Sequence, residues 1–195
     1  MHTEKSTAKD IVSAGIAVRP QSAEGVGAGG VYTVVCHDAN GNMKWSDSFH
    51  NLVVNQGLQD MNSKYFSGSG YTAAWFLGLV TGPGSGTTFA AGDTLASHAG
   101  WTENTAYTGN RKAATFGTAT TADPSVINNA VATGGTPAVF TMNANAQTIA
   151  GAFLCSVTSG TSGVLFSAGD FTGGDKIVDS GDTLTVTYTF SLDAA

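Results

Sequence analysis

The sequence predicts a mainly β protein: an antiparallel β-sandwich with one short α-helix and an extended N-terminal arm. Three observations support this class. A C-terminal segment alternates strictly between apolar and small polar side chains, an Asn-Gly pair joins two other alternating segments, and 26 glycines accompany only 11% charged residues. Alternation with a period of two is typical of half-buried strands, and frequent glycine is typical of a turn-rich chain. We expect a single β-rich domain over 31–195, a length that suffices for a complete core.

Residues 1–30 are expected to form the arm. They are polar and then glycine-rich, ending in GVGAGG at 25–30, without sustained periodicity. The apolar run IVSAGIAV at 11–18 is too short to span a membrane, and it lacks the pattern of a secretory signal. Fully extended, an arm of this length reaches up to about 100 Å. We therefore expect it to be long enough to contact a neighbouring subunit.

The stretch 31–54 predicts a β-hairpin with Asn40-Gly41 in a type I′ turn, which needs positive φ at both central residues. That turn fixes the register of the two strands. The predicted pairs are Ala39–Asn42, Cys36–Trp45, Val34–Asp47 and Tyr32–Phe49, with Thr33–Ser48 and His37–Lys44 on the opposite face. Asp47 is the one polar residue on the apolar face.

The next segment, NQGLQDMNSKYFSG, predicts a helix of about three turns with Asn55 as N-cap and Gly68 after its C-terminus. Its apolar stripe is expected to dock on a sheet. The stripe consists of Leu58, Met61, Tyr65 and Phe66.

The remaining elements are expected to be strands. AAWFLGLV at 73–80 is apolar on both faces, which favours a strand inside a sheet, and TGPGSGTT after it indicates a loop. In the last strand, Leu184 to Leu192 alternate with threonines and Ser191, so one face is core and the other is a threonine ladder facing solvent or a partner. Shorter strands are predicted near 111–118, 138–143, 147–157 and 163–168.

Candidate metal ligands lie in two stretches. DANGN at 38–42 resembles the start of a calcium loop, but an EF-hand beginning at Asp38 would need glycine at its sixth position and glutamate at its twelfth, where the chain has Met43 and Phe49. The other stretch holds Asp170, Asp175, Asp179 and Asp182 among glycines. Such aspartates are common in solvated turns, and calcium binding or acid–base chemistry are the alternatives. The repeated GDTL at 92–95 and 181–184 is explained by aspartates that accept backbone hydrogen bonds, Asp93 by capping a single helical turn.

No catalytic pattern is found in the sequence. The histidines at 2, 37, 50 and 98 fit no zinc motif, and no nucleophile motif or phosphate-binding loop is present. Cys36 and Cys155 are expected to be buried free thiols, with a disulfide as the alternative. Trp101 and Glu103 are expected to anchor a loop, with a sugar-binding platform as the alternative. We therefore predict a non-enzymatic protein with no catalytic, cofactor-binding or metal-binding residue.

Charge excludes a further class. The net charge of −6 argues against nucleic acid, because phosphate binding needs a basic face, and the eight Lys and Arg residues are scattered. We expect neither nucleic acid nor a membrane as partner.

Four segments in order resemble a group of small virion structural proteins of tailed bacteriophages. They are HNLVVNQGLQDMNSKYFSGSGYTAAWFLGLV from 50, FAAGDTLASHAGWTENTAY from 89, GAFL from 151 and GDTLTVTYTF from 181. The resemblance covers most of 31–192 and implies a particle component, without catalytic residues to transfer. Because no secretory pattern is seen, we expect a virion protein that is assembled in the host cytoplasm. A charge-poor, threonine-faced domain suits a subunit that attaches to many copies of another protein. We therefore expect a capsid decoration protein that binds the major capsid protein or other virion proteins and is a homo-oligomer on the particle. A neck, fibre or tail component and a carbohydrate-binding adhesin are the alternatives.

Overall fold

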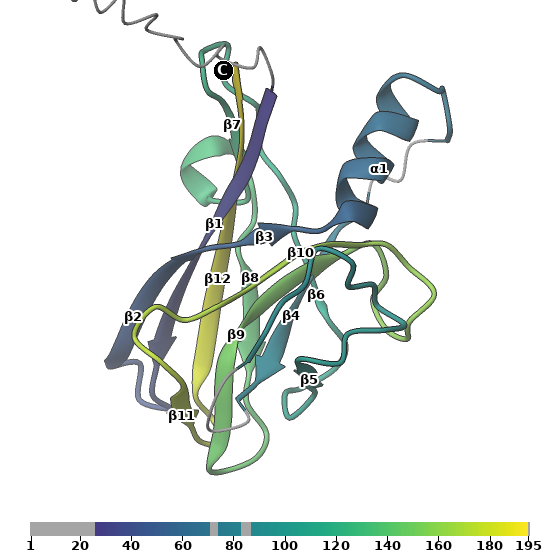
Figure 1. Ribbon diagram of the computed structural model, residues 1–195. Coiled ribbons are helices and arrows are strands. Elements are labelled where there is room, and N and C mark those ends of the chain that lie inside the picture. Colours follow the sequence, from purple (N-terminus) through teal and green to yellow (C-terminus); the bar gives the residue numbers. More distant parts are fainter. Residues whose placement is uncertain (1–25, 71–73, 83–86, 195) are drawn as a thin grey trace, which may run out of the picture.

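The computed structural model describes residues 26–70, 74–82 and 87–194 (Figure 1). Residues 1–25 of the arm expected over 1–30 lie outside these ranges, as do residues 83–86 of the loop predicted over 81–88. The described elements are β1 (Val26–His37), β2 (Met43–His50), β3 (Leu52–Val53), α1 (Asn55–Tyr65), β4 (Phe76–Thr81), β5 (Thr102–Asn104), β6 (Lys112–Ala113), β7 (Ser125–Asn128), η1 (Val131–Thr133), β8 (Ala138–Thr141), β9 (Gln147–Cys155), β10 (Leu165–Asp170), β11 (Lys176–Val178) and β12 (Thr183–Ala194).

The strands form two antiparallel sheets that pack together as a β-sandwich, as the sequence predicts (Figure 1). Sheet A has the order β2-β1-β12-β7, and β8 also pairs with β12. Sheet B has the order β3-β10-β9-β4-β5, with β11 paired to β9 and β6 paired to β4. The chain therefore crosses between the sheets several times, and β1 and β12, near its two ends, lie side by side.

The ladder between β1 and β12 is the longest in the fold and runs from the pair Val26–Ala194 to the pair His37–Thr183. Residues 26–30, which we expected in the arm, instead extend β1 along β12. Gly30 is required there, because a Cβ at this position would overlap the ring of Tyr188. The strand thus begins inside the glycine-rich segment.

The main core lies between the sheets. Side chains of β12 alternate as predicted: Leu184, Val186 and Tyr188 are fully buried, while the threonines between them are half-buried on the other face. The Tyr32 hydroxyl lies 2.7 Å from the hydroxyl of Ser167 and so links sheet A to β10 of sheet B. Burial raises the pKa of Tyr32 well above its usual value, so the phenol stays protonated and able to donate this bond.

A second, smaller core covers the other face of sheet B. Residues of the irregular segment 87–101, among them Leu95 and Trp101, pack there against Val80, Phe153 and Leu165. β4 is consequently buried on both faces and lies between β9 and the pair β5 and β6. This confirms the interior position predicted from its apolar sequence.

The hairpin register is confirmed from Tyr32–Phe49 to Cys36–Trp45, but the turn differs from the prediction. A bulge pairs His37 with Met43, where we expected Lys44. Asn42 was expected to pair with Ala39, but its carbonyl accepts a hydrogen bond from the Asp38 amide at 2.8 Å. The Gly41 amide donates a hydrogen bond to the Asp38 carbonyl. Positive φ was expected for both Asn40 and Gly41, but only Gly41 has it, at 85°. The turn is therefore a three-residue loop with a glycine bulge, a common alternative to type I′.

Asp47, the polar residue on the apolar face of the hairpin, has partners from β11 and the loop before it. Its carboxylate accepts a hydrogen bond from the Gly173 amide at 3.1 Å and lies 3.8 Å from Lys176. Burying a carboxylate is tolerated when it is paired and hydrogen-bonded in this way. These contacts remove the conflict that the sequence pattern raises.

Two differences concern the short strands. The strand predicted near 111–118 shrinks to β6, with an isolated bridge between Thr115 and Thr136 beyond it. The segment around Asp93 forms turns with a bridge between Thr94 and Ser97, not the single helical turn that we expected. In both places irregular backbone is held by isolated hydrogen bonds, such as that from the Thr136 amide to the Thr115 carbonyl at 2.8 Å. A search for hydrophobic periodicity does not detect such contacts.

Candidate interaction surface

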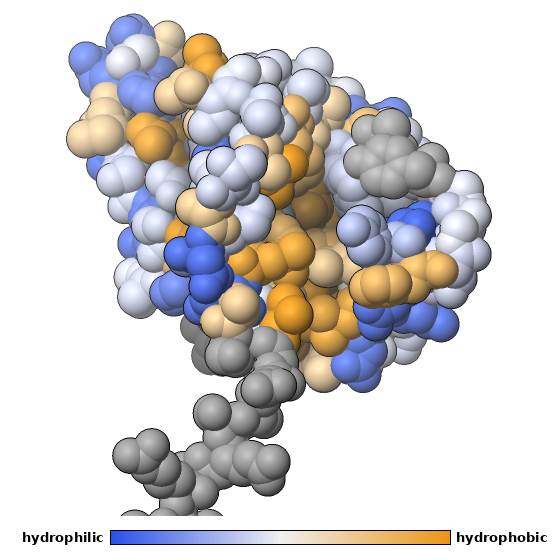
Figure 2. Space-filling view, turned by 90° about the horizontal axis from the view of Figure 1, so that it is seen from above, coloured by the Kyte–Doolittle hydropathy of each residue, from blue (hydrophilic) through white to orange (hydrophobic). Residues whose placement is uncertain are grey.

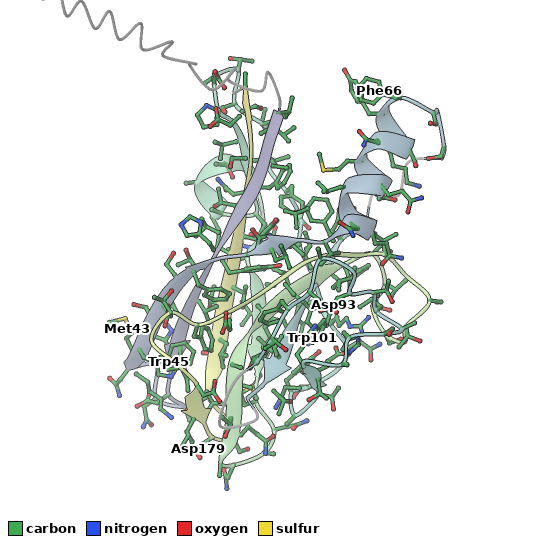
Figure 3. All side chains as sticks on the ribbon, in the orientation of Figure 1. Met43, Trp45, Phe66, Asp93, Trp101 and Asp179 are labelled. Atoms are coloured by element: carbon green, nitrogen blue, oxygen red, sulfur yellow. The ribbon has the colours of Figure 1, made fainter. Side chains whose placement is uncertain are left out.

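Helix α1 exposes most of the apolar stripe that we expected to dock on a sheet. Tyr65 is 84% exposed, Phe66, the residue after the helix, is 79% exposed and Leu58 is 39% exposed, while Met61 alone packs against the main core. The rings of Tyr65 and Phe66 meet edge to face at 4.9 Å. Figure 3 shows Phe66 at the free end of α1, away from both sheets. The prediction of a fully docked stripe is therefore wrong.

The position of α1 is set by its first turn. Asn55 is its first helical residue rather than its N-cap, which is Val54, without a side-chain cap. The Val54 amide donates to the Phe166 carbonyl at 3.1 Å, and the buried Gly57 brings the helix against the same backbone. The helix is thus attached to β10 by its N-terminal end and projects with its C-terminal end (Figure 1).

The outer ends of β1 and β12 project on the same side of the molecule as α1 (Figure 1). Ala28 lies opposite Leu192 and Gly30 opposite Phe190, on the sheet face that is core further along. Phe190 and Leu192 are only half-buried, and Val26 at the rim is 72% exposed. The apolar face of sheet A therefore continues beyond the part that sheet B covers.

An apolar cleft lies between this end of sheet A and α1. Phe166, Phe190 and Met61 belong to one packed cluster. We define the cleft by these three residues together with Leu192, two residues after Phe190 on the same face of β12, and Leu58, about one helical turn before Met61 on α1. Phe190 and Leu192 form one wall, Leu58 and Met61 the other, and Phe166 the floor. The ring of Phe166 contacts that of Phe190 at 5.4 Å and that of Trp75 at 5.3 Å. Figure 2 looks down on this end and shows hydrophobic residues gathered in a recess. Recessed apolar surface of this kind marks binding sites on folded domains.

The opposite face of sheet A carries the predicted threonine ladder. Thr183, Thr185, Thr187 and Thr189 are half-buried there, as is usual at the centre of a sheet face. Their cross-strand neighbours on β1 include Thr33, whose hydroxyl lies 3.2 Å from that of Ser48 on β2. Val31, Val35 and Val139 lie beside these threonines, so this face mixes small polar and aliphatic side chains.

The acidic stretch 170–182 is not gathered into one site. The Lys44 ammonium donates a hydrogen bond of 2.6 Å to the Asp182 carboxylate, and the Asp179 carboxylate lies 3.5 Å from the same ammonium. Asp182 also accepts the amide of Asp179, as expected for an aspartate in a turn. Within the described ranges, no three His, Cys, Asp or Glu residues lie close enough to hold a metal ion.

Trp101 is a core residue rather than a binding platform. It is 4% exposed, stacks on His98 at 4.0 Å, and its indole nitrogen donates to the Asp93 carboxylate at 3.0 Å. Glu103 is bound by Arg111 through two hydrogen bonds of 2.8 and 2.6 Å. These contacts overturn the platform alternative for Trp101 and Glu103.

Both cysteines are free and buried, which confirms the preferred prediction over a disulfide. Burial raises the pKa of Cys36 to about 11, with a contribution from the nearby charge of Asp182. Burial also raises the pKa of Cys155. Neither thiol has the depressed pKa and access that a nucleophile needs.

Comparison with protein-family models, with curated proteins and with solved structures finds no match to this chain. No helix within the described ranges is long and apolar enough to cross a membrane. The features available for a functional proposal are therefore the sandwich, the apolar cleft and the exposed aromatic pair.

Proposed function

We propose that the protein is a non-enzymatic structural component of a tailed-bacteriophage virion, and specifically a capsid decoration protein. Its partner is then the major capsid protein or another virion protein, and many copies sit side by side on the particle. The resemblance of its ordered segments to small virion proteins motivates the proposal. The observation that carries it is the exposed aromatic pair, Tyr65 and Phe66, on a charge-poor β-sandwich.

An exposed aromatic pair supports attachment to a protein surface for an energetic reason. Aromatic residues dominate the binding energy of protein interfaces, and two adjacent rings held at a projecting helix end can enter a pocket of a partner. Weak contacts of this kind are multiplied when many copies bind one lattice. The low charge agrees with a partner that is protein rather than nucleic acid.

The test is co-sedimentation with tailed-phage heads and tails that were assembled without this protein and then separated. The wild-type chain should bind heads, and Phe66→Asp should weaken binding by about tenfold or more, because a charge replaces an interface aromatic. Val139→Asp, at a residue that is 48% exposed on sheet A, is the matched control and should bind as the wild type does. Binding to purified tails alone would favour a neck, fibre or tail component, and binding to neither would overturn the proposal.

A further inference from the structure

We propose that the apolar cleft is the docking site of the chain's own residues 11–18, the sequence IVSAGIAV. This inference does not depend on the role in a virion. It rests on the apolar walls of the cleft, on the place where the described chain begins, and on the composition of the segment that precedes it.

The cleft needs an apolar occupant. The side chains of its walls and floor carry no charged group. Sheet A continues its core-facing alternation from Phe190, whose ring contacts Phe166 of sheet B, to the half-buried Leu192 and the exposed Val26. Covering such a surface removes apolar area from water, which is favourable by roughly 25 cal/mol per Å². A peptide with large aliphatic side chains is therefore the matching chemistry.

The described chain begins at the rim of the cleft. Val26 lies on the same face of sheet A as Phe190. Phe190 pairs with Gly30, and Val26 precedes Gly30 by four residues, a distance of about 13 Å along β1. The eight residues from Val18 to Val26 span up to about 28 Å. That reach is enough for the segment ending at Val18 to return into the cleft of the same chain.

The segment before Val26 contains one apolar run of the right kind. IVSAGIAV has four β-branched aliphatic side chains, those of Ile11, Val12, Ile16 and Val18, among small residues, and Asp10 and Arg19 bracket it. Because burying an unpaired charge is costly, Asp10 and Arg19 limit the part of the segment that can enter an apolar cleft to residues 11–18. Because the run is tethered, its effective concentration at the cleft is of the order of millimolar, far above that of a second copy in dilute solution. The chain's own segment is therefore the favoured occupant.

The experiment is disulfide trapping in the full-length chain. Val12→Cys is combined with Leu58→Cys, and diamide is the oxidant that converts the two thiols into a disulfide. The native Cys36 and Cys155 are buried and should not take part. The control pairs Val12→Cys with Val139→Cys, which replaces an exposed residue of sheet A on the face away from the cleft. A linked monomer should form at least about tenfold faster with Leu58→Cys than with the control, because docking raises the local thiol concentration.

A second pair of variants tests the chemistry of the contact. In the Val12→Cys/Leu58→Cys background, Ile16→Asp should slow linkage to the control rate, whereas Gln21→Asp, outside the apolar run, should not. Equal rates for Leu58→Cys and Val139→Cys, or linkage only between two copies, would overturn the proposal. If Leu58→Cys impairs folding, Met61→Cys, on the same wall of the cleft, replaces it with the same expected outcome.

Discussion

The indole nitrogen of Trp101 donates a hydrogen bond of 3.0 Å to the carboxylate of Asp93, inside the second core. The same carboxylate oxygen accepts the Ala90 amide at 3.0 Å. Asp93 thus fixes the irregular segment 87–101 over the outer face of sheet B. This explains the first GDTL motif by architecture, without a ligand.

We expect Asp93→Ala to destabilise the fold by about 1–3 kcal/mol, because it leaves the buried indole N–H without its acceptor. Urea denaturation followed by Trp fluorescence measures the change. Asp193→Ala, at an exposed position of β12, is the control and should have little effect. If both variants have the wild-type midpoint, the Trp101–Asp93 contact does not hold this segment.

The turn of the first hairpin gives a second prediction, which separates two turn types. Gly41 has positive φ, so Gly41→Ala should cost about 1–2 kcal/mol. Asn40 does not have positive φ, so Asn40→Ala should change stability by less than about 0.5 kcal/mol. Thermal melts of both variants decide the matter, since a type I′ turn would make both substitutions costly.

The sequence could predict those features of the fold that depend on local periodicity. Apolar and polar residues of β12 alternate with the period of a strand. The register from Tyr32–Phe49 to Cys36–Trp45 could be predicted because apolar residues alternate on both sides of one turn. The turn type was missed because Asn-Gly fits more than one hairpin loop. The signal that distinguishes them is Asp38, whose carboxylate accepts the amides of Asn40 and Asn42 at 2.8 Å each.

The interaction surface could be predicted only in part. Helical spacing identified Leu58, Met61, Tyr65 and Phe66, but it could not tell docking from exposure. The docking contact is made by Gly57, which has no side chain and therefore adds nothing to an apolar stripe. The cleft itself joins β10, β12 and α1, which are far apart in sequence, so its existence depends on sheet order. Hydrophobic patterns do not carry that information.

Acid should weaken the fold through Asp38 and Asp179. The pKa of Asp38 is lowered by hydrogen bonds from Asn42, of which the side-chain bond has the larger effect. The pKa of Asp179 is lowered by the hydrogen bond from the Ala146 amide and, to a smaller extent, by the charge of Lys44. A carboxylate with a lowered folded-state pKa contributes stability above its unfolded value of 3.8, and this contribution is lost as the pH falls below 3.8 through the folded value. Urea midpoints from pH 7 to pH 2 should show the loss. Asp38→Asn should flatten this slope, and a slope unaffected by Asp38→Asn would contradict the role of Asp38.

The two thiols should be unreactive in the folded protein. Because burial raises the pKa of Cys36 to about 11 and also raises that of Cys155, little thiolate exists near pH 8, and reagents have no access to it. Labelling with Ellman's reagent should detect no thiol in the native protein and both thiols in guanidinium. Rapid labelling of one thiol in the native state would show that this part of the core opens.

The last prediction concerns the sign of the effect of Gly57→Ala. In a helix that touches nothing, replacing an interior glycine by alanine stabilises by about 1 kcal/mol. At position 57 the added Cβ would lie 2.5 Å from the carbonyl oxygen of Phe166, so α1 would have to move away from β10. We therefore expect destabilisation, measured by urea denaturation, together with a change in the fluorescence of Trp75, whose ring contacts Phe166 at the base of the cleft. Gly70→Ala is the matched control, because a Cβ there meets nothing within 4 Å, and it should leave both signals as they are. A more stable Gly57→Ala protein would mean that α1 does not rest on β10, and the helical wall of the apolar cleft would then be misplaced.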